Sequence, residues 1–255
     1  MLAVERITAI EKALDASDCI SVAGLSTSFK VTEETIRRDL EKLVQKDPTV
    51  IRVHGGAYRI KEFDQEAPYQ LREAMLVAEK ERIARRSLAL LEPGDTIMLD
   101  SSTTALHLAQ CIKLSTLKLS VITNSLRIAT ELSDCNHTNL IVTGGTYRQA
   151  SRSFIGYATT RAMEDLHADK AFVSCSGLHP AYGLTDNNEG EAQVRRLMLA
   201  NSGSRYLLVD SDKFGRCKNY RIADLDGIKA LFTNREPDEG IRSLMSECGV
   251  ELIVC

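Results

Sequence analysis

Apolar positions recur with two different periods along the chain, and the change of period divides it into two regions. In the first sixty residues they follow the three-to-four-residue spacing of amphipathic helices, which predicts helices over residues 4–15, 21–29 and 32–46. An apolar and basic stretch at 50–53, followed by two glycines, predicts a short β-ribbon over 50–60. The first region is therefore predicted to be a small, mainly helical domain.

After a helix predicted over 71–91, the pattern changes to short apolar runs separated by helical stretches. The predicted strands are 96–99, 119–122, 140–142, 171–174, 205–209, 230–233 and 251–254. Strands that alternate with helices form a parallel sheet with helices on both faces. The polar stretch 61–70 contains Pro68 and shows no period, so a linker at 61–75 is predicted to join a domain at 1–60 to an α/β domain at 76–255.

The helix predicted at 32–46 has two chemically different faces. Ile36, Leu40, Leu43 and Val44 form an apolar stripe, and at about 100° per residue the opposite face is polar and basic. Thr32 can cap the helix. The polar side chains could bond base edges and phosphates in a major groove, although an ordinary amphipathic helix with a solvated face would show the same pattern. The candidate DNA-binding residues are Thr32, Thr35, Arg37, Arg38, Lys42, Arg52 and His54.

The composition is that of a soluble protein with its own core, since 44% of the 255 residues are hydrophobic and 26% are charged. No apolar run approaches the roughly 20 residues needed to span a bilayer, and the amino terminus does not resemble a signal peptide. The seven cysteines include no C-x-x-C pair, which favours reduced thiols over disulfides or zinc. A cytoplasmic protein without membrane contact, metal or cofactor is expected.

The net charge of −3 excludes a protein that coats nucleic acid through bulk charge. Residues 1–60 hold nine basic and nine acidic residues, whereas the segment 30–61 holds eight basic and five acidic ones, a local excess of three positive charges. DNA binding would then depend on where these charges lie and on doubling the contacts by assembly. A homodimer or homotetramer is expected.

Small and polar residues gather where the predicted strands end, which is where ligands bind in open α/β sheets. The hydroxyl-rich turn at 100–104 offers backbone N–H groups, hydroxyls and the positive end of a helix dipole to an anion such as phosphate. A Ser/Thr-rich helix cap would have the same sequence. Asn124 could both donate to and accept from a sugar hydroxyl, and Lys213 adds a cation. The candidate ligand-binding residues are Asp100, Ser101, Ser102, Thr103, Thr104, Asn124, Gly144, Gly145, Lys170, Glu191 and Lys213.

Two sets of motifs resemble one family. T-I-R-R-D-L followed by R-V-H-G-G-A resembles the amino-terminal winged helix of the DeoR family of bacterial transcription regulators. D-S-S-T-T, I-T-N-S, T-G-G-T, A-D-K-A-F, G-E-A-Q-V and D-S-D-K-F-G follow in the order of that family's sensor domain, which is similar in fold to ribose-5-phosphate isomerase. Three positions depart from the family pattern. Gly24 replaces an acidic residue, Ser102 replaces glycine, and Asp47-Pro48 stands where glycine usually ends the recognition helix.

The resemblance implies an α/β protein with a small N-terminal winged helix-turn-helix domain that binds double-stranded operator DNA. The α/β sensor domain that follows, with its mostly parallel sheet, would bind a phosphorylated sugar. A repressor of a sugar-catabolism operon is therefore expected. The alternative is a phosphosugar isomerase with an appended DNA-binding domain, since Lys213, Glu191 and Asp100 could act as acids and bases. The strand end that reads C-S-G-L has no carboxylate pair, which favours the regulator, and assaying turnover of pentose and hexose phosphates would separate the two.

Overall fold

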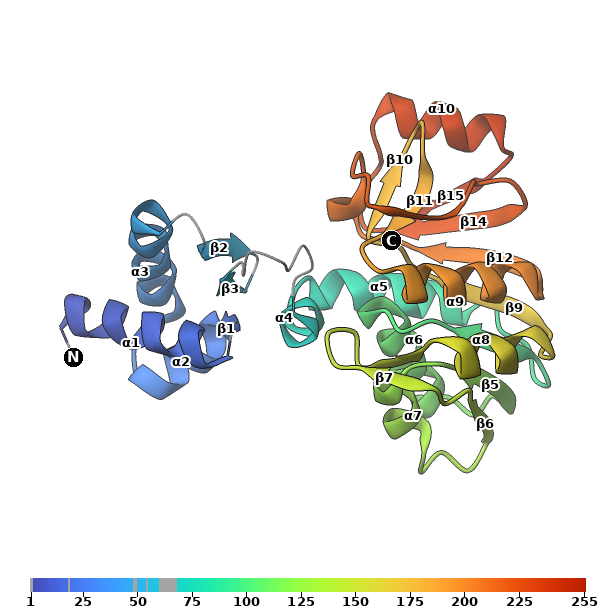
Figure 1. Ribbon diagram of the computed structural model, residues 1–255, viewed down its shortest axis with the longest axis horizontal. Helices are drawn as coiled ribbons and strands as arrows, with labels where there is room; N and C mark the ends of the chain where they lie inside the picture. The colour runs from blue at the N-terminus through green and yellow to red at the C-terminus, as the bar shows by residue number, and fades with distance from the viewer. Residues whose placement is uncertain (1, 18, 48–49, 54, 60–67) are drawn as a thin grey trace. The chain divides into compact units, whose positions relative to one another are not determined.

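The chain forms two compact units, Met1–Val77 and Ala78–Cys255, which are described separately below. Figure 1 shows the elements of each unit in this computed structural model. The structure describes residues 2–17, 19–47, 50–53, 55–59 and 68–255. Both units fit the predicted fold class, a helical winged domain followed by an α/β domain.

In its described residues, the first unit has four helices and a three-stranded antiparallel sheet of order β1-β3-β2. Its elements are α1 (Ala3–Ser17), β1 (Cys19–Ser21), α2 (Val22–Phe29), α3 (Glu33–Lys46), β2 (Val50–Val53), β3 (Gly56–Arg59) and α4 (Tyr69–Ala74). The three helices predicted before residue 50 are confirmed, and so is the ribbon β2–β3. Strand β1 was not predicted, because three residues between two helices are too few to show a period.

Side-chain caps fix where α2 and α3 begin. The Ser21 hydroxyl accepts a hydrogen bond from the Gly24 N–H (3.0 Å), and the Thr32 hydroxyl accepts one from the Thr35 N–H (3.3 Å), as predicted for Thr32. Gly24 lies in the first turn, where an added Cβ would come within 2.7 Å of the Ser21 hydroxyl.

The apolar stripe of α3 holds the first unit together. Ile36, Leu40 and Leu43 are fully buried, and they pack in one cluster with Ile10 and Leu14 of α1. Removing a large aliphatic side chain from such a core costs about 2–5 kcal/mol. The ribbon closes the cluster, because Gly56 lets β3 approach β1. An added Cβ there would lie 2.2 Å from the Ile20 carbonyl oxygen.

Part of the predicted linker is a helix of the first unit. Residues 61–67 of the linker lie outside the described part of the chain, but Tyr69–Ala74 forms α4, whose contacts are with β1 and β3. Tyr69 and Leu71 are buried. The predicted helix over 71–91 is correspondingly divided. It breaks at Leu76, which adopts a left-handed conformation with φ +50°, before the next helix begins.

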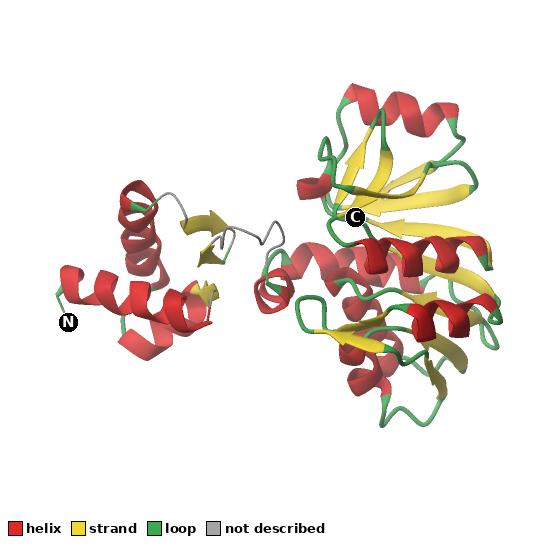
Figure 2. Cartoon of the chain, in the orientation of Figure 1, coloured by secondary structure: helices red, strands yellow, loops and turns green. Residues whose placement is uncertain are grey.

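The second unit is built on a seven-stranded sheet of order β15-β14-β12-β9-β4-β5-β6, in which every neighbouring pair is parallel. Figure 2 shows its strands in yellow between red helices. All seven predicted strands are present. The strands are β4 (Thr96–Leu99), β5 (Leu119–Thr123), β6 (Thr138–Val142), β9 (Ala168–Val173), β12 (Ser202–Leu208), β14 (Ile228–Thr233) and β15 (Glu251–Val254). The helices are α5 (Val77–Leu88), α6 (Thr103–Leu114), α7 (Leu126–Leu132), α8 (Tyr157–Glu164), α9 (Glu189–Ala200) and α10 (Glu239–Glu247).

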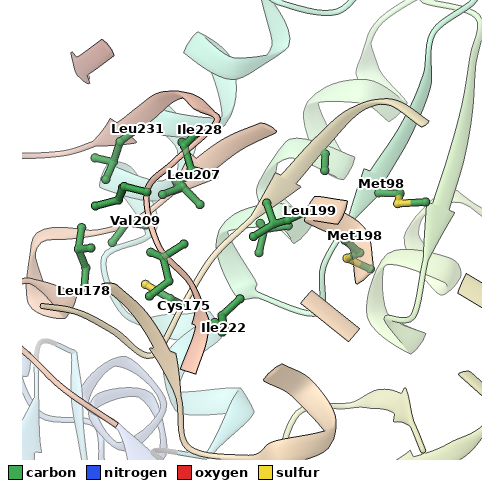
Figure 3. Close-up of a cluster of buried hydrophobic side chains, with 14 of the residues drawn as sticks. Met98, Cys175, Leu178, Met198, Leu199, Leu207, Val209, Ile222, Ile228 and Leu231 are labelled. Carbon is green, nitrogen blue, oxygen red and sulfur yellow. The ribbon is translucent and has the colours of Figure 1, made fainter. Parts of the chain in front are cut away.

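Alternate side chains of each strand face two separate cores. Ile97 and Leu99 pack in one cluster with α5, α6 and α7, whereas Met98 packs in another with α8, α9 and α10. Figure 3 shows the second cluster, in which Cys175 lies among leucine, valine and isoleucine side chains. The result is a three-layer sandwich, in which the sheet is buried on both faces. None of the helices in the described residues is long and apolar enough to span a membrane.

Two small antiparallel sheets were not predicted. The hairpin of β7 (Thr146–Arg148) and β8 (Ser153–Ile155) follows β6, and β10 (Gly177–His179), β11 (Gly183–Asp186) and β13 (Tyr220–Ala223) form a three-stranded sheet. Each of these strands is three or four residues long, which is too short for a clear alternation of apolar and polar residues. The hairpin carries residues that bond the strand ends described next.

Candidate functional site

The polar face of α3 carries most of the residues predicted to contact DNA. Thr35 is partly buried, while Thr32, Arg38 and Lys42 are exposed on the side of α3 away from its apolar stripe. Arg37 lies at the border of that face, with 43% of its side chain exposed. Arg52 is exposed on the neighbouring strand β2, and His54 lies outside the described residues. The two threonine hydroxyls bond each other across the helix start (2.9 Å).

Each predicted DNA-contacting arginine that the structure describes forms an ion pair within the first unit. Arg37 pairs with Glu33 (2.7 Å), Arg38 with Glu34 (3.3 Å), and Arg52 of β2 with Glu41. Lys42 has no acidic partner among the described residues. The cations on this face therefore differ in how readily they can reach a phosphate.

A buried ion pair orients α3 against α1. The Arg6 guanidinium donates to both carboxylate oxygens of Asp39, with 3.2 Å between Nη2 and Oδ1, and both residues are more than nine-tenths buried. A bidentate pair of this kind fixes both distance and orientation. This pair was not predicted from the sequence, although Asp39 within the apolar stripe at 36–43 was a signal that a buried cation would be needed.

The second candidate site lies where the strand order of the sheet reverses. From β4 the chain proceeds through β5 and β6 toward one edge, and then returns to β9 on the other side of β4. In sheets of this kind the crevice at such a switch point, outside the carboxyl ends of the strands, is where ligands bind. The loop after β4 and the loop after β9 meet there, because the Ser174 N–H donates to the Asp100 carboxylate (2.9 Å).

The buried Asp100 carboxylate holds the loop after β4 in place through several hydrogen bonds. Its Oδ1 accepts from the Ser102 N–H (3.1 Å), and its Oδ2 also accepts from Arg195 Nε (2.7 Å). The side chain is 1% exposed. These contacts indicate that Asp100, predicted as a candidate ligand-binding residue, holds the loop in place.

Arg195 is the centre of a buried charge cluster that the sequence analysis missed. Besides Asp100 it binds Asp186, and its Nη2 lies 3.8 Å from Glu191 Oε2. Burial acts to lower the pKa of Arg195, but the net shift is upward, because the three carboxylates favour the charged form. The signal in the sequence was the arginine four residues after Glu191 on α9, next to apolar positions.

Glu191 joins the loop after β4 to the β7–β8 hairpin. Its carboxylate accepts from the hydroxyls of Ser101 (2.7 Å), Ser151 (2.6 Å) and Ser153. Burial acts to raise the pKa of Glu191, but the net shift is downward, because Arg195 and the three hydroxyl donors favour the carboxylate. Glu191 is 2% exposed, so it does not belong to a solvated helix face.

The start of α6 has unused hydrogen-bond donors. Ser102 is the N-cap, and its hydroxyl accepts from the Ala105 N–H (3.1 Å), so serine in place of glycine gives this helix a cap. The Ser101 hydroxyl is committed to Glu191. Neither the backbone N–H groups nor the hydroxyls of Thr103 and Thr104 have a partner among the described residues. An anion at this helix start would therefore meet Thr103 and Thr104 first.

Asn124 presents an unpaired acceptor at the neighbouring strand end. Its Nδ2 donates to the Phe154 carbonyl (3.0 Å), which orients the amide, and its Oδ1 is buried with no partner among the described residues. A buried acceptor left unpaired costs about 1–3 kcal/mol, so a donor from a ligand would be favourable. Gly144 (φ +63°) has open space beside its Cα, whereas at Gly145 an added Cβ would lie 2.0 Å from the Thr159 hydroxyl of α8.

Lys213 lies at the carboxyl side of the sheet, and Lys170 does not. Burial lowers the pKa of Lys218, and the charges of Arg216 and Lys213 act in the same direction, which indicates a group of cations beside the η1 turn (Ser211–Lys213). Burial raises the pKa of Cys175, after β9, to about 12, and the nearby Lys213 opposes this shift. Lys170 instead lies opposite Ile97 and pairs with Asp95, which precedes β4. It is therefore not brought together with the other candidates.

A helix-turn-helix unit joined to an α/β unit with polar groups at its strand ends is the architecture of a transcription regulator. The family model described as the DeoR-like helix-turn-helix domain matches residues 6–63, and that described as the DeoR C terminal sensor domain matches residues 76–235. The chain belongs to the DeoR family of helix-turn-helix transcriptional regulators. Among the described residues, no group of three metal-ligating side chains lies close enough to hold an ion.

Several relatives cover nearly the whole chain. The HTH-type transcriptional regulator YulB of Bacillus subtilis is 39% identical over 92% of this chain and 90% of its own length. The HTH-type transcriptional repressor GlcR of the same species is 32% identical over 98% and 95%, and the L-fucose operon activator of Haemophilus influenzae is 34% identical over 86% and 87%. These relatives are named as regulators, and this chain is a regulator rather than an enzyme. Ribose 5-phosphate isomerase A of Methanocaldococcus jannaschii aligns with 53% of each chain, with a TM-score of 0.40 and 16% identity.

Proposed function

We propose that this regulator binds operator DNA with α3 and the β2–β3 ribbon, and that a phosphorylated sugar bound at the carboxyl edge of the large sheet modulates this binding. One observation carries the effector proposal. Unpaired donors at the start of α6 lie beside the unpaired, buried Oδ1 of Asn124, one strand away. A phosphate needs donors and a sugar hydroxyl needs an acceptor, so the two halves of such a ligand match the two features.

The proposed roles follow from which groups are unoccupied. The phosphate binds the N–H groups and hydroxyls of Thr103 and Thr104 at the positive end of α6, and Lys213 adds a charge-assisted bond. Asn124 accepts a bond from a sugar hydroxyl, and the open space at Gly144 allows the backbone to approach the sugar. Asp100, Ser101, Ser102 and Glu191 hold the loop in place instead of touching the ligand. Lys170 has no role in the site.

We propose that the chain represses a sugar-catabolism operon. Support comes from the names of its relatives, one of which is a repressor, although another is an activator of the L-fucose operon. Effector binding would change the geometry or the order of the paired DNA-binding units. Measuring transcription from the operator in vitro, with and without the effector, tests the sign of regulation. Transcription that rises when the protein is added without effector would contradict repression.

Arg38→Ala should weaken operator binding by about 1–3 kcal/mol if Arg38 contacts a base edge. Lys42→Ala should weaken binding to all sequences by a similar factor and flatten the salt dependence, because a lysine on a phosphate contributes through counterion release. The operator can be selected from a random duplex library with the full chain, and affinity measured by fluorescence anisotropy. Wild-type affinity of the Arg38→Ala protein for that operator would rule out α3 as the recognition helix.

The full chain should form at least a dimer, and its operator should contain two half-sites. The reason is that residues 1–60 carry no net charge, so that one copy offers few favourable phosphate contacts. Analytical ultracentrifugation at micromolar concentration measures the assembly, and footprinting measures the site. A monomer that binds a single half-site tightly would contradict this prediction.

A further inference from the structure

Two carboxylates lie on the face of α3 that is proposed to enter the DNA groove. Glu34 and Glu41 are seven residues apart, and Arg38 and Lys42 lie between and beside them at helical spacing. The Glu34 and Glu41 side chains are 60% and 54% exposed, so neither is needed to complete the core. A phosphate that approaches this face meets negative as well as positive groups.

Each of these carboxylates is paired with one of the arginines proposed to contact DNA. Glu34 Oε1 lies 3.3 Å from Arg38 Nε, and its Oε2 lies 3.8 Å from Arg37 Nη1. Glu41 pairs with Arg52 of β2, eleven residues along the chain. Exposed ion pairs of this kind stabilise a fold by only about 0–1 kcal/mol. Their larger effect is on what the arginines can bind, because a guanidinium that pairs with a carboxylate is less available to a phosphate.

Because the first sixty residues carry no net charge, these ion pairs have a large effect on how strongly the domain binds DNA. Residues 1–60 hold equal numbers of basic and acidic residues, and sequence-independent affinity for DNA comes almost entirely from phosphate contacts. Base contacts form only at the correct sequence, where their favourable free energy offsets the cost of breaking an ion pair. Opening such a pair costs free energy on any sequence, and only the operator supplies base contacts that offset this cost. The pairs therefore lower affinity for bulk DNA while operator binding persists.

We propose that Glu34 and Glu41 are specificity-determining residues, which restrain sequence-independent DNA binding by holding Arg38 and Arg52 in ion pairs. The inference rests on the proposed role of α3 in DNA binding. Lys42, which has no acidic partner among the described residues, is the cation that first meets the phosphate backbone. Arg38 and Arg52 exchange their carboxylates for DNA only when the contacts available at the operator favour the exchange.

The test measures binding of the full chain to a fluorescein-labelled 20-base-pair duplex of random sequence across a range of salt concentrations. Glu34→Gln should tighten this binding about three- to tenfold and steepen the slope of log K against log salt by up to ~0.9, the value for one additional phosphate contact. Glu41→Gln should act in the same direction, and it leaves the first turn of α3 unchanged. The matched control is Glu11→Gln, which removes the same charge from the same unit but whose partner is Lys46. It should change affinity by less than about twofold.

A double mutant separates ion pairing from bulk charge. In the Arg38→Ala background, Glu34→Gln should change affinity for the random duplex by less than about twofold, because its closer partner is absent and only the 3.8 Å contact with Arg37 remains. Equal gains from Glu34→Gln and Glu11→Gln, or a full gain in the Arg38→Ala background, would overturn the inference while leaving α3 as the DNA-binding helix. If Arg38→Ala alone leaves binding to both the random duplex and the operator unchanged, the role of α3 itself fails.

Discussion

Thr103→Glu is expected to abolish the response to a phosphorylated sugar while operator binding survives. The substitution places a carboxylate among the N–H groups and hydroxyls at the start of α6, where it occupies the donors and repels a dianion. Isothermal calorimetry against pentose and hexose phosphates, beginning with the strongest hit of a thermal-shift screen, measures the loss. A ligand at 100 times its Kd stabilises the protein by about 2.7 kcal/mol, which such a screen detects readily.

Two controls separate charge from bulk in this experiment. Thr103→Gln has the same size as Thr103→Glu without the charge and should retain measurable binding. Lys213→Ala should weaken binding of the sugar phosphate by about 1.5–3 kcal/mol, the usual contribution of a bond to a charged group. Lys229→Ala should have no effect, because Lys229 is an exposed residue near the amino end of β14, away from the carboxyl edge of the sheet. The dephosphorylated sugar should hardly bind. Equal affinity for sugar and sugar phosphate, or an unchanged response in Thr103→Glu, would remove this site from consideration.

Arg195→Leu is expected to cost the second unit about 3–5 kcal/mol of unfolding free energy at pH 7. The substitution leaves the buried carboxylates of Asp100, Asp186 and Glu191 without their common cation, and breaking a buried ion pair from one side is costly in this range. Urea unfolding followed by far-UV circular dichroism measures the loss. Arg196→Leu is the matched control, because Arg196 is the next residue on α9 but is exposed, and it should cost no more than about 0.5 kcal/mol.

The stability gap between wild type and Arg195→Leu should narrow as pH falls from 7 to 4. In the wild type the pKa of Glu191 is lowered from its ordinary value of 4.5. Its ionised form therefore stabilises the fold above that pH, and this contribution is lost as pH falls through the lowered pKa. In the Arg195→Leu variant, burial without the arginine should raise the pKa of Glu191 above its ordinary value. The buried carboxylate is then protonated as pH falls, which removes its destabilising charge from the variant. If the difference in unfolding free energy between the two proteins stays constant or widens as pH falls, the buried carboxylates do not depend on Arg195 for their stability.

The helix pattern of the first unit was readable from the sequence, because its information is local. Ile36, Leu40 and Leu43 repeat at helical spacing, and Thr32 marks the start of α3 by a hydrogen bond to a residue three positions away. The partner of Asp39 was not readable in the same way. Arg6 lies 33 residues earlier, and no spacing rule connects the two.

In the candidate sensor site, too, the sequence identified residues by local pattern but not their contacts with distant residues. Most of the candidate residues from Asp100 to Lys213 were identified from their positions after strands, and Lys170 and Glu191 from the motif pattern, but their roles were not. Ser101 and Glu191, 90 residues apart in the chain, bond each other and are thereby withdrawn from ligand binding. Lys170 follows the motif pattern and yet lies toward the opposite end of its strand from the site.

By itself, the sequence determined the fold class, the seven parallel strands, the polar face of α3 and the hydroxyl-rich turn at the start of α6. Each of these depends on residues within one element or one turn, so periodicity and capping chemistry suffice. Only the tertiary structure decided the strand order, and with it the switch point between β4 and β9 where the proposed site lies. It also decided that Arg195, Asp186 and the serines of the β7–β8 hairpin converge there, because contacts between distant segments follow from packing and not from sequence spacing.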